Sequence, residues 1–177
     1  MFLYTWVHAS RPWTPNTDEF FAYYGRYIAL VPDGGEVVSH LESNFERTFA
    51  ALSALTPEQS RFRYAPDKWS VRQVVGHLSD AERVFAYRAL RFARADETPL
   101  PGFDEQTWMP NAEFDHRDLS DLLSEWRSVR GASLTLFSSL SPQAWMRRGV
   151  ASGNVMSVRA LAYTVAGHEL HHLNGFA

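Results

Sequence analysis

The sequence contains no cysteine, which removes several kinds of chemistry at once. Disulfide bonds, cysteine-ligated zinc sites and a cysteine nucleophile are all excluded. Long apolar runs are lacking too, because no segment approaches the roughly 18 residues that a membrane-spanning helix needs. The apolar start MFLYTWVHASRPW lacks the basic residues of a secretory signal. These absences predict a cytoplasmic protein with no membrane partner.

An excess of positive charge is also absent, since 17 basic residues face 20 acidic ones and the net charge is −3. A surface that follows nucleic-acid phosphates needs clustered positive charge, so nucleic acid is not an expected partner. The hydrophobic share of 45% and the charged share of 21% are ordinary for a globular protein. A chain of 177 residues can bury a sizeable core as one domain.

Strand signals are nearly absent, whereas helical periodicity recurs along the chain. Apolar residues at spacings of three and four predict four long helices, over residues 37–55, 70–94, 118–140 and 157–173. Serine caps mark two of the starts, at Ser70 and Ser157. We therefore expect an all-α four-helix bundle with short extra helices. Residues 1–17 show no period and are interpreted as an N-terminal extension to a single domain over 18–177.

The connection between the second and third predicted helices is unusually long, at about residues 95–117. Connections of this length in compact domains are commonly lids or crossovers. Such a connection would let the second and third helices run parallel. Its proline-rich and aromatic composition also suggests a pocket wall.

The stretch GHELHHLNG contains His168-Glu169-Leu170-His171-His172, which matches the zinc-protease pattern H-E-x-x-H. Such a protease needs a third ligand, commonly downstream, but the five residues after His172 offer no good one. The protease interpretation is therefore disfavoured. His168 and His172 still lie one helical turn apart on a largely apolar face, where they could share a cation. Core histidines bound to carbonyl groups remain the structural alternative.

A third histidine, His77, lies on an apolar face of the second predicted helix. Both helices begin with a serine cap followed by Val-Arg, and both later carry Gly-His, at Gly76-His77 and Gly167-His168. The two glycines suggest close helix approach at this level. We therefore predict a metal site formed by His77, His168 and His172. Three nitrogen ligands leave open positions on zinc, nickel, cobalt, copper or iron, and they disfavour magnesium and calcium.

No residue stands out as the catalytic acid or base. Glu169 and Asp80 are weak candidates. Glu169 is expected to face solvent or to support a ligand histidine, and Asp80, one turn beyond His77, to support a ligand histidine. His171 is expected at the edge of the site or in solvent.

Two stretches, KWSVRQVVGHLSDAERVFAYR (68–88) and AGHELHHL (166–173), resemble the DinB-like, or YfiT-like, metalloenzyme family. The resemblance covers about residues 18–174. It implies a four-helix bundle of up-down-down-up topology whose metal is bound by His77, His168 and His172, and it implies a homodimer. Characterised members use low-molecular-weight thiols such as bacillithiol or mycothiol in S-transfer or isomerisation.

Together, these features predict a metal-dependent enzyme, with zinc or nickel foremost, that activates a thiol or water toward a small electrophilic substrate. This is the leading hypothesis, and the family resemblance suggests a thiol-dependent S-transferase as one form of it. The alternatives are a metal-dependent hydrolase, a bundle that binds a metal or small ligand without catalysis, and a purely structural bundle.

Overall fold

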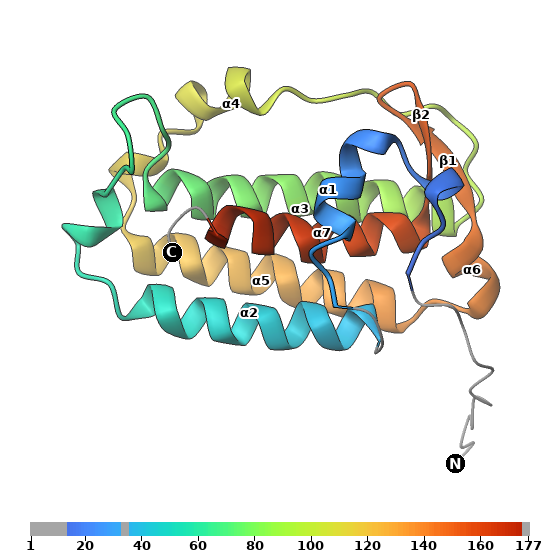
Figure 1. Cartoon of the computed structure of the whole chain (residues 1–177), viewed down its shortest axis with the longest axis horizontal. Helices are drawn as coiled ribbons and strands as arrows, with labels where there is room; N and C mark the ends of the chain where they lie inside the picture. Colours follow the sequence, from blue (N-terminus) through green and yellow to red (C-terminus); the bar gives the residue numbers. More distant parts are fainter. Residues whose placement is uncertain (1–13, 33–35, 175–177) are drawn as a thin grey trace, which may run out of the picture.

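The computed structural model describes residues 14–32 and 36–174, and it is built on four long helices (Figure 1). They are α2 (Val37–Ser53), α3 (Val71–Ala93), α5 (Leu119–Ser138) and α7 (Val158–Leu173). Each begins and ends within two residues of its predicted range. The protein is therefore an all-α four-helix bundle. Of the predicted N-terminal extension, residues 1–13 lie outside the described part of the chain.

The short extra helices are present as well. Three are α-helical: α1 (Gly25–Ile28), α4 (Glu105–Ala112) and α6 (Pro142–Met146). Four are 3-10 helices, over Thr17–Glu19, Ala22–Tyr24, Gln59–Arg61 and Phe114–His116. Within the two described ranges, no helix is both long and apolar enough to cross a membrane.

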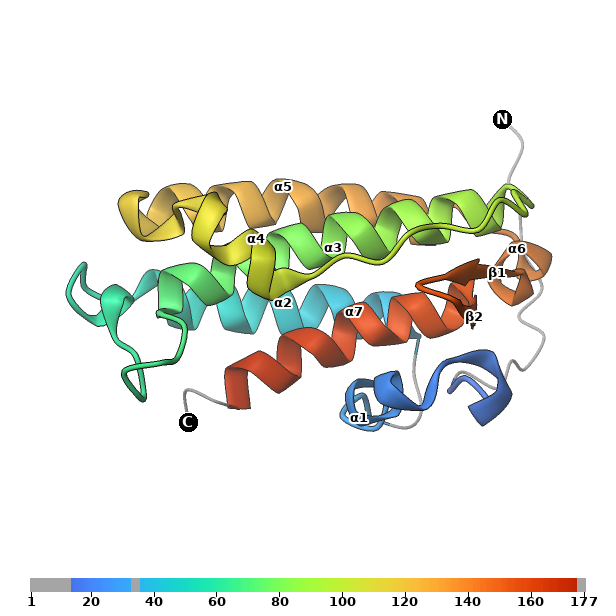
Figure 2. The same ribbon diagram turned by 90° about the horizontal axis from the view of Figure 1, so that it is seen from above.

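The bundle has up-down-down-up topology, as Figures 1 and 2 show. After α3 ends, the chain runs back over the length of the bundle to α4 and then enters α5 in the same direction as α3. The long connection is thus a crossover, and α3 and α5 are parallel. Helix α7 runs antiparallel to α3, so the beginning of α3 lies near the end of α7.

Serine caps start the two helices that matter most for the site. Ser70 Oγ accepts a hydrogen bond from the Gln73 amide, while the Gln73 side chain accepts one from the Ser70 amide. This reciprocal pair satisfies two of the amides that a helix start leaves free. Ser157 caps α7 by a single bond, which its Oγ accepts from the Ala160 amide.

Helix α7 is buried on all sides from Val158 to Glu169. Helices α2 and α3 pack against it, and α1 lies along it on the side away from α5 (Figure 2). This surrounding explains why its first three turns are composed largely of small and apolar residues.

The two glycines before the histidines make room for neighbouring parts of the chain. A Cβ atom at Gly167 would overlap the backbone of Tyr27 in α1, and one at Gly76 would overlap the ring of Phe114. Close helix approach was expected at both glycines, whereas the neighbour at Gly76 is a side chain. Gly167 instead lets the backbone of α1 rest directly on α7.

A two-stranded hairpin, which the sequence did not reveal, precedes α7. Strands β1 (Arg148–Ala151) and β2 (Asn154–Ser157) pair antiparallel, with Gly149 opposite Met156. Ser152 and Gly153 form the turn with φ of 53° and 74°. The crossover is tied to this hairpin, because the Leu100 amide donates to Val150 O at 2.9 Å and the Ser152 amide donates to Leu100 O at 3.1 Å.

Candidate metal centre

Three histidines from the two capped helices meet at one point. His77 comes from the second turn of α3, and His168 and His172 come from the last turns of α7. The Nε2 atom of His168 lies 3.1 Å from Nε2 of His77 and 3.1 Å from Nε2 of His172. One ring nitrogen from each of the three lies within 4.8 Å of the others. The structure therefore brings together the same three residues that the sequence singled out.

Burial keeps these imidazoles neutral. It lowers the pKa of His77 to about 4 and, together with the charges of its neighbours, that of His172 to about 3. Burial also lowers the pKa of His168 well below its ordinary value, and the neighbouring histidines add to the effect. At pH 7 each ring can therefore present a lone pair.

Hydrogen bonds alone cannot satisfy this arrangement. A neutral ring nitrogen carries either one hydrogen or one lone pair, so Nε2 of His168 can form a good hydrogen bond with only one of its two neighbours. A cation among the three nitrogens satisfies all of them. Zinc–nitrogen bonds of about 2.0–2.1 Å in tetrahedral geometry place nitrogens roughly 3.3 Å apart. The two distances from His168, 3.1 Å each, are close to this value.

Aromatic rings pack around the cluster and shield it in part from solvent. The Trp69 ring lies 4.8 Å from the His77 ring between centroids, and the Tyr27 ring lies 5.2 Å from that of His168. Phe85 is 6.1 Å from His168. Such surroundings lower the local dielectric constant and so strengthen electrostatic interactions in the site.

An open pocket of about 870 Å³ has the three histidines in its wall. The crossover contributes Phe103, Glu105 and Gln106, which confirms that this connection forms a pocket wall. The hairpin contributes Ser152 and Asn154. The segment before α2 contributes Phe21, Tyr23, Tyr24, Arg26 and Tyr27. The pocket therefore extends from the histidines to the hairpin turn.

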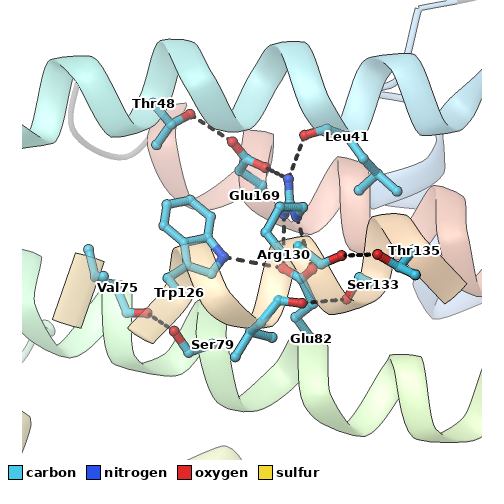
Figure 3. Close-up of polar contacts among 12 residues, drawn as sticks. Leu41, Thr48, Val75, Ser79, Glu82, Trp126, Arg130, Ser133, Thr135 and Glu169 are labelled. Carbon is cyan, nitrogen blue, oxygen red and sulfur yellow. Dashed lines mark hydrogen bonds and ion pairs between the residues drawn. The ribbon is translucent and has the colours of Figure 1, made fainter. Parts of the chain in front are cut away.

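Glu169 does not face this pocket or the solvent. Its side chain is fully buried on the far side of α7, where it accepts hydrogen bonds from Thr48 at 2.7 Å and from Arg130 at 2.9 Å (Figure 3). Burial raises the pKa of Glu169. The expected solvent-facing position was wrong, and these contacts do not support a role as a base at the histidines.

Asp80 lies on the side of α3 that faces α5. Its carboxylate is 3.3 Å from Arg83, whose guanidinium also pairs with Glu125 of α5 at 2.6 Å. Nothing in this surface network connects it to the histidines. His171 is exposed at the edge of the pocket, as expected, and its ring packs 5.1 Å from that of Tyr27.

Two groups of residues at or beside the site were missed from the sequence. Tyr27 and Arg26 belong to a segment predicted only as a short helix, whose aromatic and basic residues were its one available signal. Glu82 and Arg130 form a buried ion pair at 2.9 Å beside Glu169. Charged residues on otherwise apolar helix faces could have indicated this pair.

Known proteins resemble the chain in sequence. The family model described as the DinB superfamily matches residues 40–174. A Bacillus licheniformis protein, provisionally named a metal-dependent hydrolase, is 32% identical over 129 residues, which are 70% of this chain and 72% of that one. An Oceanobacillus iheyensis protein with a similar provisional name is 29% identical over 79 residues, or 44% of this chain. This alignment spans only 45% of that relative's length.

Solved structures share the fold. Bacillus subtilis YfiT, described as a probable metal-dependent hydrolase with an unusual four-helix bundle topology, superposes with a TM-score of 0.68 and 21% identity. The superposition covers 91% of this chain and 87% of that one. A mycothiol-dependent maleylpyruvate isomerase superposes with a TM-score of 0.65 and 12% identity, over 77% of this chain and 57% of the other.

Proposed function

The chain belongs to the DinB superfamily, and on this premise we propose that it is a metal-dependent enzyme whose ion is held by His77, His168 and His172. The observation that carries the proposal is the meeting of three neutral imidazoles at 3.1 Å contacts in a pocket wall, with His77 and His168 buried and His172 half-buried. The provisional names of its relatives, as metal-dependent hydrolases, support it. The nitrogen-only ligand set favours zinc or nickel over magnesium or calcium.

Such an ion, when bound, lowers the pKa of a coordinating thiol or water and polarises a carbonyl group. The chain's own residues contribute the rest. The rings of Trp69, Tyr27 and Phe85 pack around the histidines and shield them in part from solvent, and the lowered histidine pKa values keep protons from competing for the lone pairs. His171 lines the same pocket at its exposed edge, and partial burial lowers its pKa, so we propose it as a proton acceptor there.

Two reaction classes fit this site. We favour a thiol-dependent S-transferase that uses a low-molecular-weight thiol, because a fold neighbour is described as mycothiol-dependent and because the chain has no cysteine of its own. A metal-dependent hydrolase is the second candidate, supported by the provisional names of the relatives. The two differ in whether turnover requires an added thiol.

Metal content in wild-type protein and in His77→Ala tests the proposal. We expect about one zinc or nickel ion per chain in the wild type by elemental analysis. Loss of a direct ligand should weaken metal affinity by more than about 100-fold, above the effect of losing a supporting partner. Competition with a chromophoric chelator measures this change.

The matched control is His116→Ala, which removes an exposed histidine at the end of the crossover. It should leave metal affinity unchanged. Circular dichroism should show the same helix content in both variants. A wild-type protein that binds neither zinc nor nickel, or a His77→Ala variant with undiminished affinity, would contradict the proposal.

A further inference from the structure

Arg88 of α3 is a buried cation whose polar partners are all neutral. Its side chain is 1% exposed. Nη2 donates to the Pro101 carbonyl at 2.9 Å and to Ser152 Oγ at 3.0 Å. Nη1 has no hydrogen-bond partner among the described residues. Burial of a charge without a counter-ion is unfavourable, so this side chain requires an explanation.

The other buried arginines of the described chain each have a carboxylate partner. Arg130 pairs with Glu82 and Glu169, and Arg159 pairs with Glu19. Arg72 lies 3.6 Å from Asp118. Within residues 14–32 and 36–174, Arg88 is thus the exception. Beside the other three arginines this position holds a carboxylate. Beside Arg88 it is available to a group from outside the described residues.

The surroundings of Arg88 connect it to the histidine pocket. Arg88 follows His77 by eleven residues, which is about three helical turns, so both lie on the same face of α3. Phe85 lies between them, with its ring 6.1 Å from that of His168 and 5.9 Å from the Arg88 guanidinium carbon. Phe103 covers the guanidinium at 5.6 Å. Both phenylalanines line the pocket.

Ser152 links Arg88 to the pocket, because its hydroxyl group contacts the guanidinium and also lies in the pocket wall. Its Oγ accepts from Arg88, so its own hydroxyl hydrogen is free to donate to a bound molecule. Ser152 is exposed, and it lines the pocket at the hairpin turn. Asn154 steadies this turn by donating to the Ser152 carbonyl at 2.8 Å. A hydroxyl backed by a buried guanidinium is a strong donor to an anion.

We propose that Arg88 and Ser152 form an anion subsite for the substrate's carboxylate. The substrate class is then an elongated molecule with its reactive group at the histidines, an apolar section beside Phe85 and Phe103, and a carboxylate at the hairpin turn. Only the reactive end depends on the function proposed above. The carboxylate can belong to the electrophile or to the thiol.

Calorimetric titration of the full chain with two pairs of probes tests the subsite. The first pair, 4-phenylbutyrate and 4-phenylbutanol, represents an electrophile without a thiol. The second pair, 6-mercaptohexanoate and 6-mercaptohexanol, represents the thiol and is titrated with and without zinc. In the wild type we expect the carboxylate of at least one pair to bind about tenfold more tightly than its alcohol, as a hydrogen bond to a charged group allows.

Two variants remove the subsite in different ways. Arg88→Gln removes the charge, and Ser152→Ala removes the exposed donor while Arg88 keeps its bond to Pro101. In both variants, the preference for the carboxylate over the alcohol should fall below about twofold, in line with loss of a charge-assisted hydrogen bond. If Arg88→Gln does not fold, Ser152→Ala alone decides. The control Arg26→Gln removes an exposed cation on another pocket wall and should keep the preference.

The proposal is overturned if the wild type shows no preference in either pair, if Ser152→Ala keeps it, or if Arg26→Gln alone abolishes it. Failure of the metal proposal would look different. In that case zinc would not bind to the wild type, whereas the preference for 4-phenylbutyrate would still depend on Ser152. The pair that shows the preference identifies which reactant carries the carboxylate.

Discussion

His168 and Glu169 are neighbours in α7, yet they belong to two polar clusters of opposite character. His168 joins the histidine cluster, in which three neutral rings face one another and not all contacts can be hydrogen bonds. Glu169 joins a cluster on the other side of the helix, which is buried and fully bonded (Figure 3). Both clusters hold helices together, but only the first is incomplete without a further atom.

The cluster around Glu169 is fully hydrogen-bonded because Arg130 donates to both of its carboxylates. Its guanidinium donates two bonds to Glu82, one to Glu169 and one to the Leu41 carbonyl. The Trp126 indole also donates to Glu82, at 3.2 Å. The comparison teaches that burial of polar groups does not by itself indicate a functional site. Unsatisfied and converging groups do.

The largest expected effect comes from breaking the bonded cluster. Arg130→Met leaves two buried carboxylates without their cation, so the free energy of unfolding should fall by about 3–5 kcal/mol. Urea denaturation measures this loss. Arg127→Met, one turn away with an exposed pair to Glu46 at 3.5 Å, should change stability by less than about 1 kcal/mol. Equal stability of the wild type and Arg130→Met would refute the contrast between the clusters.

A second effect should appear in the histidine cluster when metal is removed and the pH is lowered. In the unfolded chain His77 takes up a proton below its ordinary pKa of 6.5, whereas in the folded protein it does so only near pH 4. The contribution of neutral His77 to the free energy of unfolding is therefore fully present above pH 6.5 and is lost as the pH falls toward 4. A shift of this size corresponds to roughly 3 kcal/mol.

The measurement is urea denaturation with chelator at several pH values, for the wild type and His77→Ala. Other groups also titrate in this range, so the informative quantity is the difference between the two proteins. That difference should change between pH 7 and pH 4, while His116→Ala should follow the wild type throughout. A constant difference would mean that His77 is not buried in its neutral form.

The smallest effect sharpens the comparison by removing one hydrogen bond. Thr48→Val deletes the hydroxyl that donates to Glu169 but preserves shape, and we expect a loss of about 1.5 kcal/mol. Thr135→Val is the control, because its exposed hydroxyl bonds only to Gly131 of its own helix at 2.9 Å. Zinc affinity, measured by calorimetry, should be the same in both. A loss of zinc affinity in Thr48→Val would show that the two clusters are coupled.

Much of the fold could be predicted because its signals are local. Ser70 and Ser157 cap their helices, and apolar residues at helical spacing continue for several turns after each cap. His77 was found because its helix repeats the Gly-His pattern of the last helix. The parallel course of α3 and α5 was suggested by the length of their connection, which is typical of a crossover or a lid, and by the family resemblance.

The rest depends on contacts between distant segments. The hairpin strands have four residues each, too few for a period of two to stand out, and Ser152-Gly153 resembles any turn. Glu169 looked solvent-facing because it follows a ligand by one residue, about 100° around the helix. That direction meets Thr48 and Arg130 only because α7 is covered on all sides. Contacts between distant segments likewise decide that Arg130 has carboxylate partners and that Arg88 has none among the described residues.

The contact between Gly167 and Tyr27 bears on how such proteins diverge. The proposed ligands lie within the range that the family model matches, 40–174, but α1 lies before it. The backbone of α1 rests directly on Gly167. The position of α1 therefore depends little on the exposed side chains of Arg26 and of Tyr23, which lies just before this helix. Substitutions there can reshape the pocket mouth while the histidines stay fixed. A short leading segment is thus where the shape of the pocket can change without moving the proposed metal ligands.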